Sequence, residues 1–115
     1  MKTLELAASF ELMDAYFRGA YFRKADMRGG DFREGDFREA DFRKGDFREG
    51  NFSYADFLGA DFRKADMRKA DMRDADFRGA YFRGANLRGA DFRGARIKKS
   101  QLSDRQLSDC VHDFD

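Results

Sequence analysis

Large apolar residues recur every five positions along most of this chain. From Ala15 to Lys99 the sequence divides, without insertion or deletion, into seventeen five-residue units, each centred on a large apolar residue. Alanine or glycine stands two positions before the centre, and aspartate usually stands between the two. Arginine follows the centre in fourteen units, and the fifth position is mostly glycine, lysine or glutamate. Such regularity has to be interpreted as a repeat before single elements are assigned.

Neither regular secondary structure has a period of five. Five residues of an α-helix advance by about 140° net, so successive central residues would spiral around the helix without sharing a face. In a continuous strand they would alternate between the two faces, because five is odd. Within one unit, however, extended backbone puts alanine and the central residue on one face and aspartate and arginine on the other. A turn at the fifth position would restore this orientation for the next unit. The pattern therefore predicts short extended segments joined by corners.

Corners that all turn in the same sense make the chain close on itself in stacked coils. Four near-right-angle corners would give a coil of about 20 residues, with parallel coils about 4.8 Å apart. The spacing by itself does not distinguish four sides from three.

The repeated unit, Ala-Asp-Phe/Met-Arg-Xaa, resembles the pentapeptide-repeat family. The consensus of that family is alanine, aspartate or asparagine, leucine or phenylalanine, and two variable residues. The resemblance covers residues 15–99 directly, and residues 10–109 if degenerate repeats are included. It implies an all-β solenoid, a right-handed quadrilateral β-helix with about 20 residues per coil. This chain departs from the consensus in its preference for phenylalanine and in its nearly uniform arginine.

The organisation expected along the chain has three parts. Residues 1–14 would form an N-terminal cap or degenerate first repeats, residues 15–99 the β-helix, and residues 100–115 a degenerate repeat with a C-terminal cap. The central residues would form the buried core stack: Phe17, Phe22, Met27, Phe32, Phe37, Phe42, Phe47, Phe52, Phe57, Phe62, Met67, Met72, Phe77, Phe82, Leu87, Phe92 and Ile97.

A short helix is expected at the C-terminal end. Ser103 and Gln106 have the spacing of a capping box, and Leu107, Val111 and Phe114 follow at intervals of four and three, as on one helical face. We predict a helix over residues 104–112 that closes the last coil. The same three apolar side chains could form a homodimer contact through this cap.

Composition changes the picture only slightly. Charged residues make up 39% of the chain and the mean hydropathy is −0.82, values found in disordered chains, but the regular apolar spacing favours a folded repeat. No apolar run approaches the ~18 residues of a membrane span, and Glu5 and Glu11 interrupt the N-terminal apolar stretch. Cys110, the single cysteine, has no intramolecular disulfide partner. We expect a cytoplasmic protein without a membrane segment.

The sequence predicts no catalytic, cofactor or metal site. His112, the only histidine, lies near Cys110 in the expected cap, where no pocket is evident. No phosphate-binding glycine loop and no metal-ligand spacing occurs. Stacked aspartates could attract calcium, but the neighbouring arginines compete for their carboxylates. The chain is therefore predicted not to be an enzyme and to need no cofactor.

A non-enzymatic repeat scaffold that binds an unidentified partner protein is the function we favour. Within the pentapeptide-repeat family that this chain resembles, some proteins act on DNA gyrase by imitating acidic duplex DNA. Residues 15–99, with 21 lysines and arginines against 15 acidic residues, disfavour this topoisomerase-binding alternative. Nucleic-acid binding is also disfavoured by the pI of 7.8 and the interleaved aspartates. An engineered or consensus-like structural repeat protein is a third alternative, against which the irregular ends argue.

Two surfaces are candidate contacts. At residues 51–58 the arginine position is lost twice in succession and a tyrosine occupies a corner, which is typical of a small recognition patch. With two tyrosines expected on the following face, the candidate partner patch is Ser53, Tyr54, Leu58, Tyr21 and Tyr81. The second surface is a basic ridge of Lys24, Lys44 and Lys64, which recur every 20 residues and would stack on one corner beside arginines.

Overall fold

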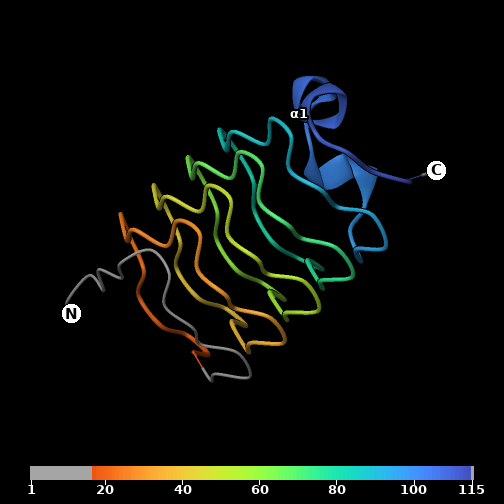
Figure 1. Ribbon diagram of the computed structural model, residues 1–115. Coiled ribbons are helices and arrows are strands. Elements are labelled where there is room, and N and C mark those ends of the chain that lie inside the picture. Colours follow the sequence, from red (N-terminus) through yellow and green to blue (C-terminus); the bar gives the residue numbers. More distant parts are fainter. Residues whose placement is uncertain (1–16, 115) are drawn as a thin grey trace.

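The chain folds into a column of stacked coils (Figure 1). The computed structural model describes residues 17–114, so the cap expected at residues 1–14 lies outside the described residues. Parallel bridges join residues that are 20 apart, as in the series Tyr21, Asp41, Asp61 and Tyr81. Twenty residues are four repeat units, so each coil has four sides, and the structure decides between the three and four sides that the spacing left open.

We number the sides faces 1 to 4 in chain order. Their central residues in successive coils are Phe17, Phe37, Phe57, Phe77 and Ile97 on face 1; Phe22, Phe42, Phe62 and Phe82 on face 2; Met27, Phe47, Met67 and Leu87 on face 3; and Phe32, Phe52, Met72 and Phe92 on face 4.

Neighbouring coils are joined by backbone hydrogen bonds that repeat in every turn. On face 2, the N–H of Phe42 donates to the carbonyl of Asp61 at 2.8 Å, and the N–H of Asp61 donates to the carbonyl of Ala40 at 3.0 Å. The corner residue adds a third bond, from the N–H of Lys44 to the carbonyl of Arg63 at 3.1 Å. Each side pairs through a single bridge residue because the turn takes the next two positions.

The backbone conformation at the corners explains why glycine is frequent at the fifth position. This position has a positive φ in every unit from residue 19 to residue 94, with values of 58° to 74°. At one corner the N–H of Ala65 donates to the carbonyl of Phe62 at 3.0 Å, closing a four-residue turn in which the third residue has φ > 0, as in type II. Nine corners nevertheless carry a side chain, Tyr54 among them, at a cost of about 1–2 kcal/mol each relative to glycine.

The central side chains fill the interior of the column. Those from Phe22 to Phe92 are all at most 1% exposed, whereas Phe17 and Ile97, at the two ends, are half-buried. Rings stack along a column, as where Phe57 lies 5.2 Å from Phe37 and 5.0 Å from Phe77 between ring centroids. Rings of adjacent columns meet edge to face, as Phe57 does with Phe62 at 5.2 Å. The small alanines and glycines leave room for these rings.

Two short helices follow the repeats, a 3-10 helix η1 (Lys99–Gln101) and α1 (Asp104–Asp109). Helix α1 has the capping box that the sequence indicated: Ser103 Oγ accepts from the N–H of Gln106 at 3.1 Å, and Gln106 Oε1 accepts from the N–H of Ser103 at 2.9 Å. The expected extension to residue 112 is wrong. Cys110 is extended, and the N–H of Val111 donates to the carbonyl of Ala90 at 2.8 Å. The helix ends before Cys110 because Val111 adds to face 4 as a further extended residue with backbone hydrogen bonds.

Two glutamine side chains take the place of the missing next coil. Gln101 Nε2 donates to the carbonyls of Phe77 and Ala80 at 2.8 and 3.0 Å. Gln106 Nε2 does the same for the carbonyls of Phe82 and Ala85 at 2.7 and 3.0 Å. Each amide thus satisfies the two carbonyls that flank one corner. The carbonyls of Phe77 and Phe82 also accept turn hydrogen bonds from the N–H groups of Ala80 and Ala85. Among the described residues, the carbonyls of Ala80 and Ala85 accept only from the two glutamines, so the cap stabilises the open end by supplying their donors.

Candidate functional site

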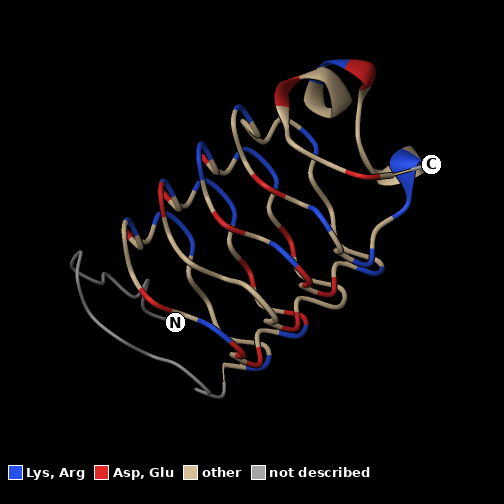
Figure 2. Ribbon diagram, turned by 45° about the vertical axis from the view of Figure 1, so that its right-hand side comes forward, with Lys and Arg blue, Asp and Glu red and all other residues tan. Residues whose placement is uncertain are grey.

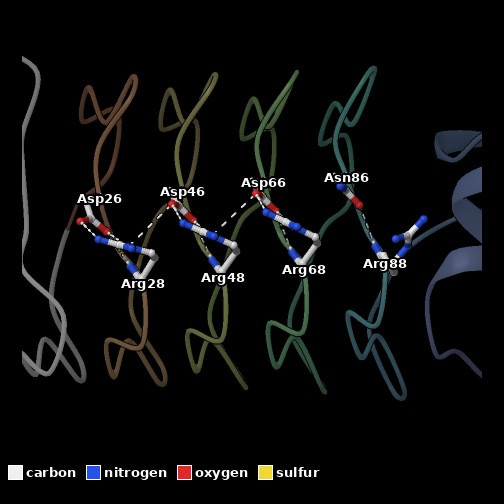
Figure 3. A network of polar contacts seen from close by, with 8 residues as sticks. All are labelled: Asp26, Arg28, Asp46, Arg48, Asp66, Arg68, Asn86 and Arg88. Atoms are coloured by element: carbon white, nitrogen blue, oxygen red, sulfur yellow. Dashed lines mark hydrogen bonds and ion pairs between the residues drawn. The ribbon is translucent and has the colours of Figure 1, made fainter.

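Most of the outer surface is a lattice of paired charges. Within a unit, the aspartate and the arginine two residues later form a two-pronged clip, as predicted from their shared outward face. In one clip, Arg48 Nε and Nη2 donate to Asp46 Oδ1 and Oδ2 at 2.8 and 2.6 Å, and the backbone N–H of Arg48 also donates to Oδ1. Figure 3 shows three such clips in a row on face 3, where Arg28 and Arg48 also lie 3.7 Å from the aspartate of the next coil, Asp46 and Asp66 respectively.

The clips lower the pKa of eight of the aspartates. Hydrogen bonds from the Arg28 side chain lower the pKa of Asp26 to about 2, and those from Arg38 lower the pKa of Asp36 to about 2. The same cause lowers the pKa of further aspartates, namely Asp31, Asp41, Asp66, Asp71, Asp76 and Asp91. These eight carboxyl groups are therefore ionised and paired with arginine at neutral pH, which leaves few of their charges available to a partner.

These shifts predict acid sensitivity that begins only at low pH. Because the folded-state pKa of these aspartates lies below the ordinary value of 3.8, their contribution to stability is complete above that value and is lost as the pH falls toward about 2. We expect the urea midpoint of unfolding to be nearly constant from about pH 7 to about pH 5 and to fall between about pH 4 and about pH 2. Asp36→Asn should lower the midpoint at neutral pH and flatten this acid limb. A wild-type midpoint unchanged down to about pH 2 would contradict the assignment.

The lattice is interrupted at residues 51–58. The prediction that Ser53 belongs to an exposed partner patch is wrong. Its side chain is buried, with the residue only 7% exposed, and its Oγ donates to Asn51 Oδ1 at 2.9 Å. At Leu58 the backbone N–H still donates to Asp56 Oδ1 at 3.1 Å, but no guanidinium follows. Within residues 17–114, the ion pair of Asp56 is to Arg38 of the coil below, at 3.7 Å.

The interruption leaves an exposed patch on face 1, which we call the Tyr54 patch and define as Tyr54, Asp56 and Leu58. Tyr54 is 65% exposed at the corner that leads into the face, and Leu58 is 36% exposed at its far end. Asp56 lies between them in the sequence and lacks the clip that pairs other aspartates. Sequence reasoning missed Asp56, although an aspartate without arginine two residues later was the available signal.

The two other tyrosines of the expected patch lie on face 2, the face that follows Leu58, as expected. Tyr21 and Tyr81 are both exposed there, but at opposite ends of a ladder that passes through Asp41 and Asp61. The structure therefore does not gather all of the expected patch residues at one place. Tyr81 adjoins the C-terminal end of the column, and Tyr21 lies in its first described coil.

The basic ridge occupies one corner of the column, between faces 2 and 3. Lys24, Lys44 and Lys64 lie at this same corner in three successive coils. The backbone N–H of each lysine donates a hydrogen bond to the coil above. Lys44 and Lys64 line a shallow surface hollow of about 260 Å³ together with Arg23, Arg43 and Arg63. Among the ion pairs of the described chain, none involves the three lysines. In Figure 2, blue segments of lysine and arginine recur along both the upper and the lower edge of the column, interspersed with red segments of aspartate and glutamate.

The residues of the C-terminal cap serve mainly their own coil. Leu107 and Phe114 are half-buried against the core, so of the expected dimer face only Val111 is well exposed. Cys110 is buried, which raises the pKa of its thiol. His112 Nε2 lies 3.1 Å from the carbonyl oxygen of Leu107, and its ring stacks on Phe114 at 4.5 Å. In residues 17–114, no group of three or more His, Cys, Asp or Glu is placed to hold a metal ion.

Comparison with known proteins identifies the repeat. The family model described as pentapeptide repeats matches residues 11–53, 46–79 and 75–111, with eight copies. The chain belongs to the pentapeptide-repeat family. Nothing among the curated proteins matches it. Pentapeptide-repeat proteins of known structure are right-handed quadrilateral β-helices, and proteins of this family are generally structural or binding scaffolds. In the described part of this pentapeptide-repeat chain, no helix is long and apolar enough to cross a membrane.

Three solved pentapeptide-repeat structures are similar to this chain. QnrB1, a plasmid-mediated fluoroquinolone resistance protein, is 23% identical with a TM-score of 0.73, over 77% of this chain and 47% of its own. Rfr23 from the cyanobacterium Cyanothece 51142 is 16% identical with a TM-score of 0.66, over 90% and 60%. HetL from the cyanobacterium Nostoc sp. strain PCC 7120, involved in the regulation of heterocyst differentiation, is 27% identical with a TM-score of 0.50, over 75% and 38%. This chain thus spans less than two thirds of each.

Proposed function

We propose that this chain is a non-enzymatic scaffold that binds a partner protein through the Tyr54 patch on face 1. The observation that carries the proposal is the local break in the charged lattice, which exposes Tyr54 and Leu58 and leaves the Asp56 carboxylate without its own arginine. The paired lattice resists burial, because each bidentate clip would have to be desolvated. A partner therefore gains most where apolar surface replaces the clip.

The chemistry of the patch suggests the complementary surface. A tyrosine ring and a leucine side chain supply apolar contact area, and tyrosine is enriched among the residues that dominate interface energies. The carboxylate of Asp56 can accept a hydrogen bond from a lysine, an arginine or a backbone N–H. We therefore propose a partner that presents an apolar pocket beside a hydrogen-bond donor.

A role in binding DNA gyrase or another topoisomerase is the less favoured alternative. Likeness to a fluoroquinolone resistance protein at 23% identity concerns the fold. A surface that imitates DNA would need an acidic face, whereas residues 15–99 carry more basic than acidic residues. The corner lysines of the basic ridge add to this difference.

The double variant Tyr54→Lys with Leu58→Arg tests the proposed patch. Arginine at position 58 restores the residue that usually follows the central position, and neither substitution touches the core. Lysine fits the corner because residues 24, 44, 64 and 69 are lysines with the same positive φ. We expect the melting temperature to be unchanged and the affinity for a partner isolated from the source cell to fall by roughly tenfold or more, as measured by isothermal titration calorimetry.

The matched control is Tyr21→Lys, which removes an exposed tyrosine from face 2. It should leave the affinity within about twofold of the original value. Undiminished binding by the double variant would exclude the Tyr54 patch, and an equal loss in the control would place the contact elsewhere.

A further inference from the structure

The last coil has an open backbone edge on face 2. In the coil below, three successive N–H groups are used: Phe62 donates to the carbonyl of Tyr81, Arg63 to Asp61 Oδ1, and Lys64 to the carbonyl of Arg83. One coil higher, across the part of the chain that the structure describes, the N–H groups of Phe82, Arg83 and Gly84 make none of these bonds. Arg83 lacks its acceptor because Tyr81 stands where aspartate usually does.

The other faces of this coil are closed more completely by the chain itself. On face 4, the N–H of Phe92 donates to the carbonyl of Val111 at 2.8 Å, and that of Arg93 to Asp91 Oδ1 at 3.1 Å. The corner N–H of Gly94 donates to both carboxylate oxygens of Asp113 at 3.2 Å. This last contact shows that a carboxylate fits the N–H of a terminal corner. Gly84, the equivalent corner residue of face 2, has no such carboxylate in the described chain.

A surface groove lies above this open edge. Its volume is about 770 Å³, and its lining includes Tyr81, Phe82, Arg83 and Gly84 together with segment 100–103 and Gln106. Tyr81 is 60% exposed at the groove. Arg83 makes no ion pair within residues 17–114, whereas Arg63 below it is clipped to Asp61. The groove therefore combines free backbone donors, an unpaired guanidinium and an aromatic side chain.

The repeat itself shows which side chain of the coil above such an arginine contacts. Four arginines lie 3.7–3.8 Å from the aspartate one coil higher, in the pairs Arg28–Asp46, Arg38–Asp56, Arg43–Asp61 and Arg48–Asp66. Arg83 has the same position on face 2 but no aspartate above it, because Gln101 occupies that position and turns its amide toward Phe77 and Ala80.

We propose that this groove binds an extended acidic segment of a partner protein, which adds to face 2 as a further rung. One carbonyl of the segment accepts from the N–H of Phe82, and an aspartate carboxylate bridges the N–H of Gly84 and the guanidinium of Arg83. The residue that points inward has to be small, because Leu102 is already buried against the core. The segment thus carries an aspartate followed by glycine or alanine, a form of strand addition. This inference deepens the proposed binding role but uses a surface separate from the Tyr54 patch.

A short blocked peptide, acetyl-Gly-Ser-Asp-Gly-Ser-amide, is the probe. Titrated into the ¹⁵N-labelled full chain, it should shift the amide signals of Phe82 and Gly84 saturably and slow their hydrogen exchange. The amides of Phe62 and Lys64, already bonded, should not move. The peptide with asparagine for aspartate should bind about tenfold more weakly, and acetate at the same concentration should leave the Phe82 amide unshifted.

Arg83→Gln and Arg23→Gln form a matched pair of variants. Both arginines follow Ala-Tyr-Phe on face 2, but the N–H groups of Phe22 and Lys24 beside Arg23 are already bonded to the next coil. Arg83→Gln should weaken peptide binding about tenfold and Arg23→Gln less than twofold. Equal losses in the two variants, or no saturable shift of the Phe82 and Gly84 amides, would overturn the proposal. Binding by the Tyr54→Lys, Leu58→Arg variant should be unchanged, so failure here and failure of the proposed function are separable.

Discussion

Replacing Phe57 with alanine is expected to lower the free energy of unfolding by about 3–5 kcal/mol. The ring is fully buried and stacks between Phe37 and Phe77 in its own column. It also meets Phe42 and Phe62 of the adjacent column at 5.8 and 5.2 Å. Because the coils above and below are fixed by backbone hydrogen bonds, they cannot collapse into the space, and the cavity term adds to the lost burial. Urea unfolding followed by circular dichroism measures the change.

Phe57→Leu is the matched control for this prediction. Leucine is accepted at the equivalent central position of face 3, where Leu87 is 1% exposed. We expect a loss below about 1.5 kcal/mol, since most of the volume is kept. If the alanine variant lost no more than the leucine variant, the ring stack would not be a main source of stability.

Deletion of residues 103–115 is expected to lower the apparent Tm by roughly 10 °C or more and to cause aggregation on heating. The deletion removes the Gln106 amide from two carbonyls, the Val111 rung from face 4 and the Asp113 carboxylate from Gly94. An uncapped coil exposes both apolar side chains and unpaired backbone, which promotes association edge to edge. Differential scanning calorimetry and light scattering report the two effects.

Two point variants within α1 separate the cap contacts from general effects of truncation. Gln106→Ala should destabilise by about 1–3 kcal/mol, because its amide is buried against two carbonyls. Arg105→Ala, whose side chain is exposed and contacts only Asp109 among the described ion pairs, should change stability by less than about 0.5 kcal/mol. An unchanged melting profile after the deletion would contradict the role of the cap.

The homodimer through the cap stays a prediction with little exposed apolar surface to support it. Leu107 and Phe114 pack on their own coil, so the surface available to a second copy is mainly Val111. Sequence spacing could indicate that these side chains share an apolar role, but it could not tell whether a neighbouring coil or a neighbouring molecule covers them. That depends on where the backbone runs after Cys110.

The five-residue period alone was sufficient to predict the local structure of each unit and the identity of the core. Alternation over the extended part puts alanine and the central residue inside, and aspartate and arginine outside, whatever the number of sides. The clip between Asp46 and Arg48 follows from the same local geometry. These features were readable because each depends on residues within one unit.

Only the tertiary structure decided features that depend on contacts between coils. The number of sides depends on the backbone angle at the corners, which side-chain spacing does not encode; bridges 20 residues apart establish it. Helix α1 ends at Asp109 because Val111 pairs with the backbone of Ala90 and Phe92, one coil below. Within residues 17–114, Asp56 pairs with Arg38 of the coil below, and the N–H groups of Phe82 and Gly84 lack acceptors because the coil above supplies none. The local sequence pattern determines whether a side chain points into or out of the column. The partners that it finds depend on residues of the neighbouring coils, about 20 positions away in the sequence.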